Sequence, residues 1–74
     1  MAKISREQYE ENVEKTFKFI KQFIEENGYA PVYREIIEGT GFKSLDTINN
    51  HLYKLKEEGK IDFVPEKART IRIK

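Results

Sequence analysis

The sequence predicts one small α+β domain, mostly helical, in which three helices precede a two-stranded β-hairpin. A long amphipathic helical pattern is followed by two shorter helical segments with a glycine-containing turn between them. After Gly59 the apolar spacing changes from about 3.6 residues to about 2, which indicates strands. A chain of this length buries only about 60% of its unfolded surface, so we expect a single domain over residues 1–74 with one core.

The first helix is predicted to begin at a capping box formed by Ser5 and Gln8 and to end at Gly28. Between these signals, apolar residues recur at spacings of three and four and mark one buried face: Tyr9, Val13, Phe17, Ile20 and Ile24. Phe19 and Phe23 widen this face towards the C-terminal end of the helix. We therefore expect the hairpin, which would be marginal alone, to pack at that end.

The second helix is predicted to be short, from roughly Val32 to Thr40, with Pro31 before it and Gly41 ending it in a left-handed conformation. Ser44 is a suitable N-cap for a third helix that continues to about Glu58. The buried stripe of this helix consists of Ile48, Leu52 and Leu55. Its other side carries amides, hydroxyls and charges: Asp46, Thr47, Asn49, Asn50, Tyr53, Lys54 and Glu57.

The two predicted strands alternate apolar and polar residues on either side of a five-residue loop, residues 65–69. Ile61 and Phe63 form the apolar positions of the first strand, and Ile71 and Ile73 those of the second. A short helix, a tight turn, a third helix with a polar face and a following hairpin together match the winged helix-turn-helix architecture.

Composition excludes several function classes. There is no cysteine and only one histidine, so we expect no disulfide, no metal site, no cofactor and no enzymatic activity. No apolar run is long enough for a signal peptide or membrane span, and we expect a cytoplasmic, nucleoid-associated protein without a small-molecule substrate. Residues 1–38 hold six basic against eight acidic side chains, whereas residues 39–74 hold eight against five. This asymmetry is typical of a surface that faces a polyanion, although ordinary solvation explains it equally well.

Several segments resemble the N-terminal DNA-binding domain of the LexA-type SOS repressors. The similarity is carried by Gly28-Tyr29-Ala30-Pro31 with Arg34-Glu35-Ile36, by Gly41-Phe42-Lys43-Ser44, by Thr47-Ile48 with His51-Leu52, by Glu58-Gly59-Lys60-Ile61 and by Ala68-Arg69-Thr70-Ile71-Arg72. The resemblance extends from about residue 13 to residue 73. It implies sequence-specific binding to double-stranded DNA in transcriptional control, with the third helix in the major groove and the wing on the backbone.

The resemblance and the chemistry of the side chains suggest two sets of DNA contacts. The candidates for base reading are Asp46, Thr47, Asn49 and Asn50. The candidates for phosphate contact are Ser44, Tyr53, Lys54, Lys67 and Arg69, of which the last two are loop cations in the predicted wing. His51 borders the buried stripe, and we expect a half-buried packing residue rather than a catalytic or pH-sensing one.

The sequence departs from the family pattern at three positions. Leu45 replaces a common proline, Val32 replaces a capping Ser or Thr, and Gly39 replaces a small helix former. Asp46 in addition brings a negative charge into the first turn of the third helix, either as a cytosine contact or as compensation of the helix dipole. The base preference of the family therefore does not transfer to this chain. The self-cleaving domain of such repressors would have to follow Lys74, so we expect no self-cleavage from these residues, in either a fragment or a stand-alone winged helix. A homodimer on paired half-sites is possible, and the alternative function is a protein-interaction module that does not bind DNA.

Overall fold

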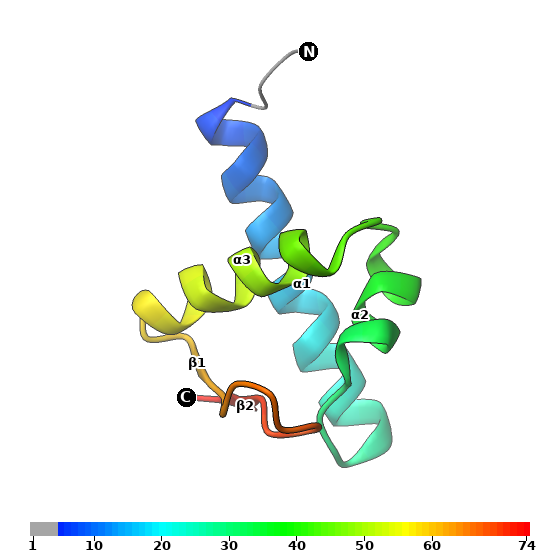
Figure 1. Ribbon diagram of the computed structural model, residues 1–74. Coiled ribbons are helices and arrows are strands. Elements are labelled where there is room, and N and C mark those ends of the chain that lie inside the picture. The colour runs from blue at the N-terminus through cyan, green and yellow to red at the C-terminus, as the bar shows by residue number, and fades with distance from the viewer. Residues whose placement is uncertain (1–4) are drawn as a thin grey trace.

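The computed structural model describes residues 5–74, so the first four residues of the expected domain lie outside it. Three helices and two short antiparallel strands follow one another along the chain: α1 (Arg6–Asn27), α2 (Tyr33–Thr40), α3 (Leu45–Glu57), β1 (Ile61–Asp62) and β2 (Arg72–Ile73). In Figure 1, α3 crosses α1, α2 lies beside both, and the strands follow the C-terminal end of α3. The predicted class, three helices and a hairpin in a winged helix-turn-helix arrangement, is confirmed.

The ends of the helices follow the predicted local signals. The Ser5 hydroxyl accepts a hydrogen bond from the Gln8 backbone N–H at 3.1 Å, and Gly28 ends α1 with a φ of 79°. The start of α2 differs, because Val32 has no side-chain acceptor. There the Glu35 carboxylate accepts from the Val32 N–H at 2.8 Å, which supplies the reverse half of a capping box.

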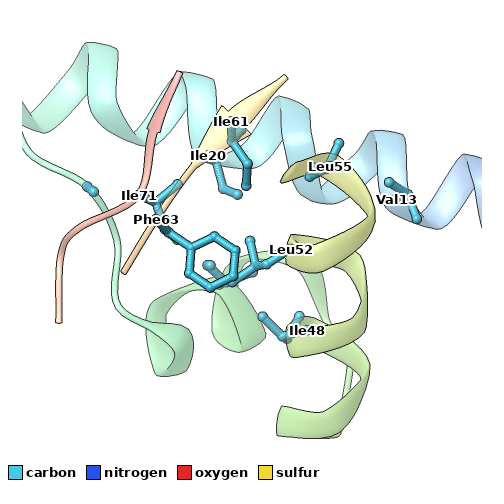
Figure 2. Close-up of a cluster of buried hydrophobic side chains, with 10 residues drawn as sticks. Val13, Ile20, Ile48, Leu52, Leu55, Ile61, Phe63 and Ile71 are labelled. Atoms are coloured by element: carbon cyan, nitrogen blue, oxygen red, sulfur yellow. The ribbon is translucent and has the colours of Figure 1, made fainter. Parts of the chain in front are cut away.

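One core joins all the elements. Figure 2 shows side chains from α1, α3 and the hairpin converging in it. Its buried hydrophobic members are Val13, Ile20, Ala30, Ile36, Ile48, Leu52, Leu55, Ile61, Phe63 and Ile71. The wing therefore contributes to the core, as an otherwise marginal hairpin requires.

The aromatic end of α1, where the hairpin was expected to pack, also contacts α2 and the segment that follows α1. The Phe19 ring occupies the space where a Cβ of Gly39 would stand, so this end of α1 packs against α2. Phe23 meets the Tyr29 ring edge-on, with 5.8 Å between the ring centroids. The first strand of the hairpin packs on α3, and Ile61 lies near Ile20 in the shared core (Figure 2).

The hairpin is shorter than its alternating pattern predicts. The strands pair Ile61 with Ile73 and Asp62 with Arg72, and the chain between these pairs is a long loop. Ile61, Phe63 and Ile71 are buried as expected, whereas Ile73 remains 37% exposed. Among residues 5–74, no helix is both long and apolar enough to cross a membrane.

Candidate nucleic-acid interface

The two faces of α3 have opposite environments: one is buried in the core, and the other is exposed to solvent. Ile48, Leu52 and Leu55 have no exposed surface and so define how the helix is rotated about its axis. Four residues on the outer side are exposed, and two half-buried residues flank them. We call this set the α3 face: Asp46, Thr47, Asn49, Asn50, Tyr53 and Lys54. All four base-reading candidates and two phosphate candidates thus lie on one surface.

The turn between α2 and α3, residues 41–44, orients the start of α3. Gly41 ends α2 with a φ of 83°, a left-handed conformation that glycine adopts without steric cost. The Phe42 ring then packs edge-on against His51, with 5.1 Å between centroids. Ser44 caps α3 by accepting a hydrogen bond from the Asp46 N–H at 3.1 Å. In helix-turn-helix proteins the N-terminal residues of the second helix contact base edges. In the first turn of α3, Leu45 and Asp46 are exposed.

His51 is a packing residue, buried more deeply than the sequence predicts. Its ring is only 2% exposed and lies edge-on to both Tyr9 and Phe42. The Thr16 hydroxyl donates its one proton to the Asn12 carbonyl at 3.1 Å, so it accepts the second hydrogen bond, 2.9 Å long, from His51 Nδ1–H. Burial lowers the pKa of His51 and thus favours the neutral ring.

Two tyrosines that the sequence analysis did not assign to the site contact the α3 face. The Tyr9 hydroxyl of α1 donates to Asn50 Oδ1, and the Tyr33 hydroxyl of α2 donates to Asn49 Oδ1 at 3.1 Å. These partners are 41 and 16 positions apart in the sequence. No local pattern could have predicted the contacts, because they depend on how the three helices pack.

Two of the concave surfaces beside the α3 face are lined by its base-reading candidates. The smaller, about 280 Å³, lies between α1 and α3 and is lined by Tyr9, Asp46, Thr47, Asn50 and His51. The larger, about 540 Å³, separates the helices from the wing loop and is lined by Tyr33, Asn49, Tyr53, Pro65, Glu66, Lys67 and Ala68. A ligand lying along α3 would therefore also reach the wing loop.

The wing loop is held in shape by Thr70. Its hydroxyl accepts from the Val64 N–H at 2.9 Å and lies 3.1 Å from the carbonyls of both Val64 and Lys67. Glu66 and Arg69 adopt left-handed backbone conformations, with φ of 66° and 58°. Such conformations cost non-glycine residues energy and persist only where surrounding contacts impose them. The loop is therefore shaped by specific contacts, although no glycine or strand pairing defines it.

Arg69 has a role inside the protein that the sequence analysis did not foresee. Its guanidinium donates to the Ala30 carbonyl at 2.9 Å and to the two carboxylate oxygens of Glu35 at 3.0 and 3.3 Å. It also stacks on the Tyr29 ring, 4.6 Å from the centroid. We call this contact between the wing and the start of α2 the Arg69 clamp. Two hydrogen bonds to its carboxylate hold the pKa of Glu35 below the ordinary value. The bond from the Val32 N–H has the larger effect, and the bond from Arg69 the next.

The remaining phosphate candidates differ in how their charges are compensated. Lys54 forms an ion pair with Glu58 at 3.8 Å. Lys67 is exposed and has no ion-pair partner among residues 5–74. Arg34 on α2 and Lys43 in the turn are also exposed and unpaired within this part of the chain, and the sequence analysis did not include them among the phosphate candidates. Their charge and exposure make both residues further candidates for phosphate contact.

Comparison with known proteins agrees with this geometry. A family model described as LexA DNA binding domain matches residues 1–70. The chain is similar to the LexA repressor of Caldicellulosiruptor saccharolyticus, with 43% identity over 68 residues that cover 92% of this chain and 34% of the relative. It is also similar to the LexA repressor of Syntrophomonas wolfei, with 47% identity over 53 residues that cover 72% of this chain and 26% of the relative. The chain spans about a third or less of the length of these relatives.

Proposed function

The chain belongs to the LexA DNA binding domain family, and on this premise we propose that it binds double-stranded DNA sequence-specifically as the DNA-reading domain of a transcriptional repressor. The observation that carries the proposal is the α3 face, a polar helix surface that projects beyond a fully buried apolar stripe. Amides and hydroxyls on such a surface match the donors and acceptors of base edges in a major groove. We propose that the protein acts on DNA in the cytoplasm.

Base reading is assigned to Asp46, Thr47, Asn49 and Asn50. All four are within the first two turns of α3, the part of a recognition helix that enters the groove. Their chemistry is mixed, because the carboxylate only accepts hydrogen bonds, whereas amides and hydroxyls also donate them. A surface of this kind can discriminate among base pairs, since each pair presents a different pattern of donors and acceptors.

Phosphate contact is assigned to Ser44, Tyr53, Lys54 and Lys67. Ser44 lies at the N-terminus of α3, where backbone N–H groups favour an anion. Lys67 on the wing has no ion-pair partner among residues 5–74. Arg69 was also expected to contact phosphate, and that stays a prediction. The Arg69 clamp supports a different main role for this residue, which is to hold the wing loop in position for Lys67.

We further propose that two copies bind one operator. A single small domain binds DNA weakly, with a dissociation constant of roughly 10⁻⁴ to 10⁻⁶ M for non-specific duplex. Dimeric helix-turn-helix proteins gain specificity from two half-sites about one helical turn apart. Neither a small-molecule substrate nor a catalytic step is part of the proposal.

Selection of bound duplexes from a random pool, repeated at several salt concentrations, tests the proposal. We expect one enriched motif, repeated at a spacing of about one helical turn. The logarithm of the affinity should fall linearly with the logarithm of the salt concentration. The double variant Asn49→Ala with Asn50→Ala should bind without enriching the motif. If the wild-type protein enriches no sequence, this result would contradict the proposal and favour a protein-interaction module.

A further inference from the structure

The two adjacent asparagines of the α3 face are both held by tyrosine hydroxyl groups from other helices. Tyr9 approaches Asn50 from α1, and Tyr33 approaches Asn49 from α2. In each pair the hydroxyl donates to the amide oxygen. Figure 1 shows why this is possible, since α3 crosses α1 while α2 lies alongside. Two similar contacts on two neighbouring side chains define the orientation of both amides.

Both tyrosine rings are fixed by packing, so the hydroxyl groups cannot simply follow a turning amide. Each ring is half-buried and packs against the hydrophobic core. The Tyr9 ring also meets His51 edge-on, with 5.8 Å between the centroids. Burial and the nearby Tyr53 raise the pKa of Tyr33, which keeps its hydroxyl protonated and able to donate.

An amide has one oxygen that accepts hydrogen bonds and one nitrogen with two protons to donate. Asparagine commonly recognises adenine with both ends, donating to N7 and accepting from the N6 amino group. Asn49 and Asn50 already use their oxygens towards the tyrosines. Among residues 5–74 neither Nδ2 has a hydrogen-bond partner, and both side chains are exposed. Each oxygen keeps a second lone pair, but the tyrosine hydroxyl fixes the direction in which the amide points. What the held amides offer most freely to an incoming ligand is therefore their N–H donors.

We propose that Tyr9 and Tyr33 are positioning residues that determine the base preference of Asn50 and Asn49. By holding the amide oxygens they direct Nδ2 towards DNA, so the two asparagines prefer base edges that only accept hydrogen bonds. In the major groove these are guanine, with N7 and O6, and thymine, with O4. Adenine and cytosine present an amino donor there and are disfavoured. The inference rests on the proposed function of the α3 face.

The test compares duplexes selected by the wild-type protein and by Tyr9→Phe and Tyr33→Phe, each of which removes only a hydroxyl. Single Asn50→Ala and Asn49→Ala variants first identify the operator positions that each asparagine reads. We expect the wild type to select guanine or thymine there. Each Tyr→Phe variant should raise the share of adenine about tenfold, at the position of its own asparagine only, because the freed amide can then bind adenine with both ends.

Tyr29→Phe is the matched control, since the Tyr29 ring stacks on Arg69 and its hydroxyl makes no hydrogen bond within residues 5–74. It should leave both positions unchanged.

A measurement on the wild type alone avoids any folding defect of the variants. Placing adenine at the assigned positions of the selected duplex should weaken binding about tenfold. Two outcomes would overturn the inference. In one, the wild type selects adenine at these positions; in the other, the wild type and both Tyr→Phe variants select identical motifs. A wild type that enriches no motif would instead overturn the proposed function.

Discussion

The Arg69 guanidinium and the Glu35 carboxylate form a bidentate pair, with N–O distances of 3.0 and 3.3 Å, that joins the wing loop to the first turn of α2. The same carboxylate accepts from the Val32 N–H and so substitutes for a missing side-chain cap. One acidic residue thus stabilises both the start of the helix-turn-helix and the position of the wing. Bidentate pairs between arginine and a carboxylate combine charge with a defined geometry.

The first prediction concerns Glu35→Gln, which removes the charge but keeps the shape of the side chain. The pKa of Glu35 is below its ordinary value of 4.5 in the folded state, so its ionised form stabilises the fold above that pH. This stabilisation is lost as the pH falls through the lower, folded-state pKa. We expect a lower thermal midpoint for the variant at about pH 7 and a smaller difference from wild type at about pH 3.

Glu38→Gln on the same helix is the control for this change, because Glu38 is exposed and forms no ion pair within residues 5–74. Its midpoint should follow that of the wild type at both pH values. Equal effects of the two substitutions at neutral pH would show that the Arg69 clamp contributes nothing specific.

The second prediction compares two leucines of α3. Leu52 has no exposed surface and Leu45 is 57% exposed. Leu52→Ala should lower the free energy of unfolding by about 2–5 kcal/mol, because it leaves a cavity in the core. Leu45→Ala should change it by less than about 0.5 kcal/mol, since it removes only surface contacts. Urea denaturation monitored by circular dichroism measures both, and similar losses would contradict the placement of the two faces of α3.

The third prediction concerns Gly39, which sequence considerations alone would mark for stabilisation. Alanine at an exposed helix position is favoured over glycine by about 1 kcal/mol. A Cβ at this position, however, would overlap the Phe19 ring. We expect Gly39→Ala to destabilise the protein, because overpacking costs about 1–3 kcal/mol and outweighs the gain in helix propensity.

A double-mutant cycle tests this reason directly. In a Phe19→Ala background the ring is absent, and Gly39→Ala should then become neutral or stabilising. Additive effects of the two substitutions in chemical denaturation would mean that the ring does not limit residue 39.

The fourth prediction is a pH dependence that arises from His51. Burial lowers its pKa in the folded state below the ordinary value of 6.5, so the unfolded chain binds the proton more readily. The free energy of unfolding should therefore fall as the pH drops below about 6.5 and stop falling below the folded-state pKa. His51→Gln, which does not titrate, should flatten the stability curve between about pH 7 and pH 5. An unchanged slope in the variant would assign the effect to other groups.

The fifth prediction concerns Lys67 and the salt dependence of DNA binding. If Lys67 contacts one phosphate, Lys67→Ala should weaken binding to all sequences alike and reduce the slope of log affinity against log salt by about 1. Lys18 lies on the exposed outer side of α1 and provides the control, since Lys18→Ala should leave the slope unchanged. Fluorescence anisotropy at four or more salt concentrations measures the slope for the wild type and the two variants. If the wing does not approach the DNA backbone, the three slopes will be equal.

Local signals predicted most of the fold because they act over a few residues. Ser5, Ser44 and the glycines that end the helices give the boundaries closely, since capping depends on side chains and backbone groups two to four positions apart. The buried stripe of α3 also follows from spacing alone, because only one face of a helix with this pattern can be apolar. The exposed α3 face is the complement of that stripe.

The sequence by itself thus determined the order of the elements, the helix ends and which side of α3 faces outward. Only the tertiary structure decided that Arg69 holds the wing to Glu35, that Phe19 excludes a side chain at Gly39, and that Tyr9 and Tyr33 reach the two asparagines. These contacts join residues that are between 16 and 41 positions apart. Periodicity describes one element at a time, whereas such contacts depend on the angles and distances at which separate elements pack.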